Sequence, residues 1–290
     1  MDNQYLIRKL EESSGYHAHS FSNRYMNWKR FYSVGKSFRQ ELRKFKGVKG
    51  PIKVLDIGCG DGWMIYRLKT RFDKEYELNF TGVDISELDI DFANKRKDYF
   101  SYEQCEFKIM DLNNLSFNAE EFDIVISSEV IEHVQRPEIL IKSLFRILKK
   151  HGLVILTTPH QGGSILARLL GIINGLSFGL IKKYEKKYEN DIINDREKSL
   201  LRFSSEEGKI GSGLGHVSVK SPQQWRRVFR DNGFIIQLLQ GTGGMLFGCP
   251  YFDKHRILFS LSIILDVLME YFTFSYLWSE NLLFELRKNR

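Results

Sequence analysis

The segment VLDIGCGDG, residues 54–62, decides the fold. It begins as a short apolar strand and continues with three glycines at alternate positions. Glycine has no Cβ, so such a run lets the backbone turn tightly into a helix while a ligand approaches the main chain. Nicotinamide-binding turns read GxGxxG, whereas the spacing here is GxGxG and Asp56 stands two places before the first glycine. An acid at that position suits a cationic group better than a pyrophosphate.

Apolar runs alternate with helical patterns on both sides of this turn. Strands rich in Ile, Val and Leu, separated by helices near 63–72, 87–97 and 137–149, predict a parallel sheet covered on both faces. The pattern stops after residue 159 and resumes with a Ser-capped helix at 221–233. The expected strands are 52–58, 79–86, 105–112, 122–130, 152–159, 234–241 and 279–288. The fold class is therefore α/β, with a doubly wound sheet of seven strands.

The 290 residues divide into four expected segments. These are an N-terminal helical cap (1–50), the core around the glycine turn (51–160), a helical insertion or lid (161–215), and a C-terminal part (216–290) that completes the core and contains an apolar helix at 257–277. The sequence contains no apolar run of membrane-spanning length and no secretory signal pattern. Its three cysteines are far apart and odd in number. A cytoplasmic location is expected.

The formal charge of +7 is unevenly distributed along the chain. Residues 1–50 carry 11 basic and 4 acidic side chains, residues 51–160 carry 14 and 19, and residues 161–290 carry 18 and 13. A nucleic-acid-binding protein would be expected to gather basic groups around its reactive site. Here the glycine turn lies in the acidic segment, so nucleic acid is not an expected partner.

Five motifs, in order, resemble those of the class I S-adenosylmethionine (SAM)-dependent methyltransferases. They are DIGCGDG at 56–62, GVDIS at 82–86, IMDL at 109–112, FDIVISSEVIEHV at 122–134 and LKKHGLVILTTPH at 148–160. Each is expected at the carboxyl end of a strand or leading into one, and open α/β sheets bind ligands at that end. Within the class the chain is similar to the methyltransferase type 11 and quinone-precursor O-methyltransferase families. The resemblance implies a Rossmann-like sheet and SAM as the cofactor.

The resemblance also implies how the turn and the second strand hold the cofactor. Asp56, Gly58 and Gly60 match the positions around the methionine end, where the acid orients the amino group. Asp84 matches the carboxylate that accepts both ribose hydroxyls. A carboxylate suits a cis-diol because two neighbouring O–H donors meet two oxygens.

Later strands are implied to hold the adenine and the sulfonium. Ile85 would pack on the adenine, Asp111 would accept from its exocyclic amine, and the N–H of Leu112 would donate to its ring. Ser128 and Glu129 would lie beside the reactive sulfonium. No metal site is expected, since the cysteines show no ligand spacing.

Three histidines are candidates for catalysis. Methyl transfer is an in-line displacement that chiefly needs alignment and exclusion of water. An oxygen acceptor benefits from a base, and histidine serves near neutral pH. His133 follows the fourth strand, His160 follows the fifth, and His216 precedes the late helix, where quinone-precursor O-methyltransferases also carry a His. Each could equally form a structural hydrogen bond.

The sequence indicates the acceptor only by class. The NPPY or DPPY tetrapeptide of amino-directed enzymes is absent, because the fourth strand leads into SSEV. The expected reaction methylates a hydroxyl of a small-molecule, lipid-linked or glycan acceptor. Two alternatives stay open: an RNA-directed methyltransferase, and a regulatory protein that binds SAM without catalysis.

Both flanks contain apolar and aromatic segments. A helix over 21–45 would place five aromatic residues near one face: Phe21, Tyr25, Trp28, Tyr32 and Phe38. It would either cover the cofactor pocket or lie on a membrane surface. The apolar segments 165–181 and 257–277 add to the second possibility, a peripheral contact on the inner face of the membrane. The later segment has one polar stripe, formed by Ser262, Asp266, Glu270 and Thr273. The oligomeric state is not indicated.

Overall fold

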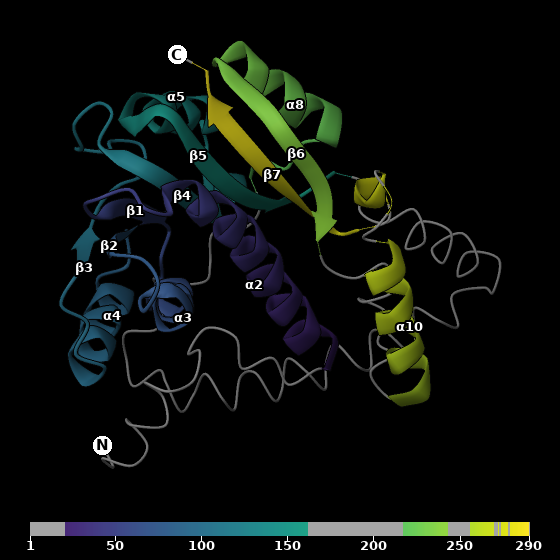
Figure 1. Ribbon diagram of the computed structural model, residues 1–290. Helices are drawn as coiled ribbons and strands as arrows, with labels where there is room; N and C mark the ends of the chain where they lie inside the picture. Colours follow the sequence, from purple (N-terminus) through teal and green to yellow (C-terminus); the bar gives the residue numbers. More distant parts are fainter. Residues whose placement is uncertain are drawn as a thin grey trace.

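The computed structural model describes residues 21–161, 217–242, 256–269, 272, 274–277 and 279–289. These residues form a twisted sheet with helices on both faces (Figure 1). The expected lid at 161–215 lies outside the described residues except for its first residue, and so does His216.

Seven strands make up the sheet, as predicted. They are β1 (Ile52–Ile57), β2 (Leu78–Asp84), β3 (Cys105–Ile109), β4 (Phe122–Ser128), β5 (Leu148–Pro159), β6 (Phe234–Thr242) and β7 (Asn281–Lys288). Their order is β3-β2-β1-β4-β5-β7-β6. The carboxyl ends of β1 to β4 therefore lie along one edge of the sheet, next to one another.

The sheet is parallel over β1 to β5, as the alternation of strands and helices predicts, and it becomes mixed at β7. The first five strands are parallel, but β7 is antiparallel to both β5 and β6. Asn281, the first residue of β7, pairs with Pro159 and Thr242, the last residues of β5 and β6. The connection from β6 to β7 thus begins and ends at the same edge, which forces β7 to run backwards.

Helices cover both faces of the sheet. The described helices are α2 (Phe21–Leu42), α3 (Trp63–Phe72), α4 (Glu87–Tyr99), α5 (Pro137–Ile147), α8 (Pro222–Asp231) and α10 (Arg256–Met269), with 3-10 turns η1 (Arg43–Phe45), η2 (Ile131–His133) and η3 (Ser275–Leu277). Apolar side chains of α5 and α8 fill one half of the core, and those of α2 and α3 fill the other. Ser221 and Gln224 form the capping box that begins α8. The predicted helix at 257–277 is shorter than expected, since α10 ends at Met269 and η3 is separate.

The described part of the N-terminal cap is helical over Phe21–Leu42, but four of the five aromatic residues expected on one face divide between buried and exposed positions. Tyr25 and Phe38 are buried, whereas Trp28 and Tyr32 are 51% and 42% exposed. The buried side of α2 instead carries side chains four residues apart, several of them polar: Tyr25, Lys29, Ser33, Ser37 and Glu41. A pattern based on aromatic residues alone missed this stripe, because tertiary partners satisfy its polar groups.

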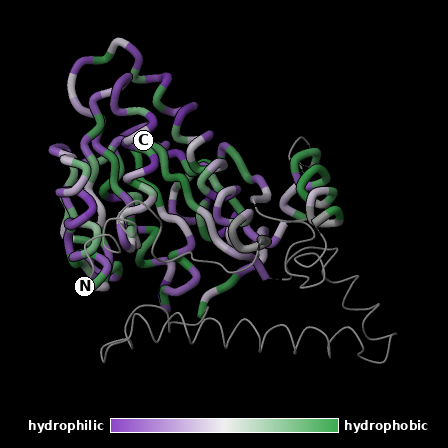
Figure 2. The backbone as a smooth tube through the Cα atoms, turned by 90° about the horizontal axis from the view of Figure 1, so that it is seen from below, coloured by the Kyte–Doolittle hydropathy of each residue, from purple (hydrophilic) through white to green (hydrophobic). Residues whose placement is uncertain are grey.

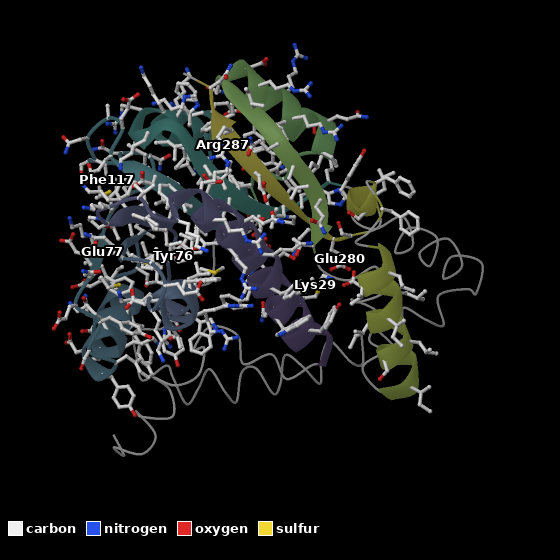
Figure 3. The ribbon with its side chains drawn as sticks, in the orientation of Figure 1. Lys29, Tyr76, Glu77, Phe117, Glu280 and Arg287 are labelled. Carbon is white, nitrogen blue, oxygen red and sulfur yellow. The ribbon has the colours of Figure 1, made fainter. Side chains whose placement is uncertain are left out.

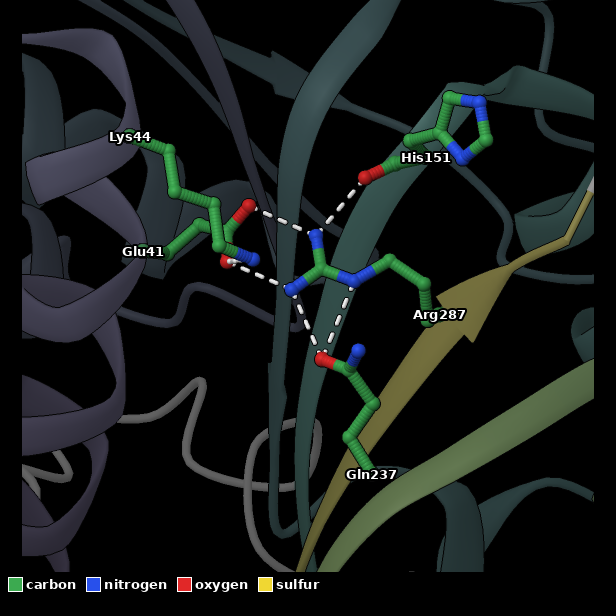
Figure 4. A network of polar contacts seen from close by, with 5 residues as sticks. All are labelled: Glu41, Lys44, His151, Gln237 and Arg287. Atoms are coloured by element: carbon green, nitrogen blue, oxygen red, sulfur yellow. Dashed lines mark hydrogen bonds and ion pairs between the residues drawn. The ribbon is translucent and has the colours of Figure 1, made fainter.

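Arg287 on β7 fastens the cap to the sheet (Figure 4). Its two terminal nitrogens each donate to a carboxylate oxygen of Glu41 at 2.6 Å. The same guanidinium donates to the side-chain oxygen of Gln237 and to the carbonyl oxygen of His151. Burial alone would raise the pKa of Glu41, but the hydrogen bonds and charges of Arg287 and Lys44 lower it below its ordinary value. The pair is therefore ionic and holds α2 across the sheet.

Candidate functional site

The three glycines of the turn after β1 have different tasks. Gly58, Gly60 and Gly62 have φ angles of 66°, 50° and 74°, in the left-handed region that favours glycine. A Cβ on Gly58 would lie 2.4 Å from Cγ2 of Val130, and one on Gly62 would lie 2.8 Å from the ring of Phe107. A Cβ on Gly60 would meet no atom within 4 Å. Gly58 and Gly62 thus serve packing, while Gly60 offers its backbone to an open space.

Asp84, at the end of β2, connects the second strand to this turn. One carboxylate oxygen accepts from the N–H of Gly60 at 2.8 Å, and the other accepts from the N–H of Ser86 at 3.0 Å. The side chain is half-buried and each oxygen keeps a second lone pair. This arrangement fits a carboxylate that accepts two ribose hydroxyls beside the turn.

Exposed apolar side chains adjoin Asp84 at the same edge. Ile85 is 61% exposed, and Ile109, which pairs with Asp84 across β2 and β3, is 54% exposed. Large apolar side chains at the end of a buried strand suit the face of an aromatic ring. Ile85 was predicted to pack on the adenine. Ile109 was not predicted, although an apolar residue at the end of a strand is a signal that could have indicated it.

Asp111 and Leu112 follow β3 directly. Asp111 is exposed, and one carboxylate oxygen accepts from the backbone and side-chain nitrogens of Asn113, both at 2.9 Å. Leu112 is half-buried and packs against the core. The N–H of Met110 donates to the carbonyl oxygen of Asp84 at 2.9 Å, so the segment lies beside the predicted ribose site.

Asp56 lies at the base of the turn with an unsatisfied carboxyl group. It is 2% exposed, and its Oδ2 has no hydrogen-bond partner among the described residues. Burial, and to a lesser degree the charge of Asp84, raises the pKa of Asp56 to about 8. A buried carboxyl group of this kind would be stabilised by an ammonium group. The residues at this edge therefore fit the methionine and ribose parts of SAM.

We expect Asp56→Asn to stabilise the free protein increasingly as pH rises from about 4 to about 8. In this range the unfolded chain ionises Asp56 near its ordinary pKa of about 4, while the folded chain keeps it protonated. The folded state then binds more protons, so wild-type stability falls with pH. Thermal unfolding across this range measures the effect, with exposed Asp91→Asn as control. If the melting temperatures of wild type and Asp56→Asn changed with pH in the same way, the raised pKa of Asp56 would be contradicted.

A buried ion pair between Arg96 and Asp61 stabilises the turn, and it was not predicted from the sequence. A guanidinium nitrogen of Arg96 on α4 donates to the carbonyl oxygen of Asp61, and another lies 3.2 Å from Asp61 Oδ2. The guanidinium also lies 5.2 Å from the ring centres of Trp63 and Phe92. Arg96 is 2% exposed, although its sequence neighbours in α4 are charged like those of a solvent-facing helix. The local sequence therefore gives no signal that this arginine is buried.

The carboxyl end of β4 brings acidic and hydroxyl side chains together. Oγ of Ser128 lies 3.0 Å from Oγ1 of Thr157 on β5. Glu129 has a φ of 59°, its N–H donates to the carbonyl oxygen of Thr157, and its buried Oε1 has no partner among the described residues. A non-glycine residue in that conformation and a buried unpaired oxygen are both typical of functional sites.

Glu132 is the most deeply buried acid of this group. Its Oε2 accepts from the hydroxyl of Thr158 at 3.2 Å, whereas Oε1 has no hydrogen-bond partner among the described residues. Burial, and then the charge of Glu129, raises the pKa of Glu132 to about 8. The carbonyl oxygen of Glu132 accepts from the N–H groups of Val217 and Ser218. Sequence reasoning did not single out Glu132, because its burial depends on β5 and on the late segment.

The structure separates the histidine candidates. His133 is half-buried, and its Nε2 lies 3.8 Å from Oε1 of Glu132. His160 is 7% exposed, and its Nε2 lies 2.8 Å from the carbonyl oxygen of Ser279, next to the entry into β7. His216 is outside the described residues. Within the described part of the chain, no group of three His, Cys, Asp or Glu side chains is placed to hold a metal ion.

The glycine turn after β1, the acid at the end of β2 and the reversed seventh strand define a class I SAM-dependent methyltransferase, with SAM as cofactor. The family model described as "Methyltransferase domain" matches residues 49–233, and the chain belongs to this family.

Individual relatives show the same class. A mitochondrial ubiquinone biosynthesis O-methyltransferase of Rattus norvegicus is 28% identical over 154 residues, which cover 52% of this chain and 43% of the relative. Phosphoethanolamine N-methyltransferase 1 of Arabidopsis thaliana is 31% identical over 105 residues, or 36% of this chain and 20% of the relative. Each match thus spans less than half of the relative's length. A solved geranyl diphosphate methyltransferase in complex with SAM, 15% identical, covers 88% of this chain and 85% of its own with a TM-score of 0.51, which shows the fold.

Proposed function

We propose that this protein transfers the methyl group of SAM to a hydroxyl group of a small-molecule acceptor. The observation that supports this proposal is the buried Glu132. Its Oε1 lies 3.8 Å from Nε2 of His133, and its carbonyl oxygen accepts from the N–H groups of Val217 and Ser218, which follow His216 in the sequence. The segments that contain the candidates His133 and His216 therefore both lead to Glu132. The name of the Rattus norvegicus relative, an O-methyltransferase, supports an oxygen acceptor.

In this proposal SAM supplies the electrophilic methyl group, and the protein's residues prepare the acceptor. Ser128 and Glu129 line the end of β4 next to the turn that holds the cofactor. His133 or His216 accepts the proton of the hydroxyl group. For His133, the resulting imidazolium favours ionisation of the neighbouring Glu132, whose carboxylate then stabilises it. His160, with its ring bound to the Ser279 carbonyl oxygen, positions the start of β7.

We also propose that the cap (1–50) and the insertion (161–215) shape the acceptor pocket, since the family's motifs lie in the segments between them. We include lipid-linked and glycan molecules among the proposed hydroxyl acceptors. We also propose that the protein acts in the cytoplasm. The part of the chain that the structure describes contains no helix long and apolar enough to cross a membrane.

We expect His133→Gln or His216→Gln to lower kcat about a hundredfold while leaving SAM affinity unchanged, because a general base contributes on the order of 10²–10⁴ to the rate. The assay follows labelled methyl groups from SAM into a catechol-type phenol, with phosphoethanolamine and RNA as competing acceptors. His151→Asn is the matched control, because this exposed histidine has a left-handed φ that Asn tolerates. Full activity of both variants would contradict the assigned base.

The other outcomes separate the alternatives. Methylation of RNA alone would replace the small-molecule proposal, and SAM binding without transfer to any acceptor in a cell extract would favour a regulatory protein.

A further inference from the structure

Helix α10 turns six apolar side chains away from the protein. Ile257, Leu261, Ile264 and Leu268 follow one another at helical spacing and are 78%, 51%, 55% and 53% exposed. The exposed set also includes Leu265, Val267, Phe272, Phe274 and Leu277. Figure 2 shows hydrophobic residues along this helix at the edge of the molecule. Contiguous exposed apolar surface of this kind marks an interaction site. We call the four spaced side chains the α10 stripe.

The only acid of α10 points the other way, into the protein. Asp266 is 6% exposed and accepts from the hydroxyl of Tyr25 at 2.6 Å. Its Oδ2 also lies 3.1 Å from Nζ of Lys29, which is 1% exposed (Figure 3). A buried pair needs this close geometry to offset the loss of hydration. The pair therefore fixes the rotation of α10 against α2 and keeps the α10 stripe outward.

The chain that follows α10 leads to the edge of the sheet at which β1 to β4 also end. The segment after α10 enters β7 at Asn281, which pairs with the last residues of β5 and β6. The neighbouring helix α2 also exposes aromatic surface: Trp28 and Tyr32 are stacked with their ring centres 5.4 Å apart and line a pocket with Tyr66 of α3. Trp and Tyr are favoured where apolar and aqueous phases meet.

We propose that the α10 stripe docks this protein on an anionic lipid bilayer, with α10 lying in the interface. The 14 residues of α10 are about 21 Å long, which is shorter than a hydrocarbon core of about 30 Å. Charge favours a bilayer over a second copy of the chain. Residues 1–50 and 161–290, which contain both helices, each carry a basic surplus, so two copies would repel while anionic lipid attracts.

Docking in this way brings the carboxyl edge of the sheet close to the lipid headgroups. An amphipathic acceptor could then reach the site without leaving the bilayer. The docking itself does not depend on the reaction, because it rests on α10, Asp266 and the charge of the flanks.

The test is co-sedimentation of the full chain with phosphatidylcholine vesicles, with and without phosphatidylglycerol. The test variant is the double substitution Leu261→Glu with Leu268→Glu, which keeps the helix and places two charges in the α10 stripe. The matched control is Val48→Glu, an exposed apolar residue far from α10 in the sequence and 62% exposed. SAM affinity and thermal unfolding of each variant establish that the fold and the cofactor site are intact.

Wild type and Val48→Glu are expected to pellet with anionic vesicles, less so at high salt, and the double variant to bind at least about tenfold more weakly. Equal pelleting of the double variant, or no pelleting of wild type, would overturn the proposal. It would also be overturned if ultracentrifugation without lipid showed a wild-type dimer that the double variant abolishes. SAM binding measured in solution keeps these outcomes distinct from a failure of the proposed reaction.

Discussion

Replacing Asp84 with alanine is expected to weaken SAM binding about a hundredfold, because two charge-assisted hydrogen bonds to the ribose are lost. The side chain also accepts from the N–H groups of Gly60 and Ser86, so alanine removes two contacts that shape the turn. Asp84→Asn keeps one of them. The asparagine oxygen can still accept from Gly60, but its NH₂ group can accept neither from Ser86 nor from the second hydroxyl.

Calorimetric titration with SAM measures both variants. We expect Asp84→Asn to lose most of the affinity that Asp84→Ala loses, and Asp91→Ala to bind like wild type. Asp91 is exposed, lies on the helix that follows and pairs only with Lys95 among the described residues. Wild-type affinity in Asp84→Ala would disprove the ribose assignment, and wild-type affinity in Asp84→Asn would limit the role of Asp84 to the turn.

Gly58→Ala is expected to destabilise the fold by roughly 2–4 kcal/mol, whereas Gly60→Ala should cost about 1 kcal/mol and chiefly impair cofactor binding. Both positions have a left-handed φ. The difference lies in their neighbours, because a methyl group on Gly58 would collide with Val130 and one on Gly60 would enter open space.

Denaturant unfolding and SAM titration of the two variants test this division. Adding Val130→Ala should return part of the stability to Gly58→Ala, since it removes the colliding methyl groups but not the backbone strain. Val130→Ala should restore no stability to Gly60→Ala. Equal loss of stability at the two glycines, or no recovery in the double variant, would show that the turn is constrained by backbone conformation alone.

Much of the candidate cofactor site could be proposed from the sequence because its signals are local. The glycines, Asp56 and Asp84 each follow a strand that is recognisable by its apolar run, and parallel strands bring such ends to one edge. The structure indeed places Gly60 and Asp84 in hydrogen-bond contact. Arg96 and Glu132 could not be predicted in the same way. Their burial is produced by Asp61 and by β5, which lie far from them in sequence.

The two flanking helices illustrate the same limit. A hydropathy pattern shows that a helix has two faces, but it does not show which face meets the protein. For α2 the buried face includes Lys29 and Glu41, which have partners on α10 and β7. For α10 the acid Asp266 is buried, whereas the side chains of the α10 stripe are exposed.

The sequence alone thus determined the α/β class, the seven strands and the glycine turn, because each depends on residue types at short and regular spacing. The cofactor followed from the resemblance of five motifs to the class I SAM-dependent methyltransferases. Only the tertiary structure decided the reversed direction of β7, the different tasks of Gly58 and Gly60, the buried acid beside His133 and the outward face of α10. These features depend on which distant side chains become neighbours, and local spacing carries no information about that.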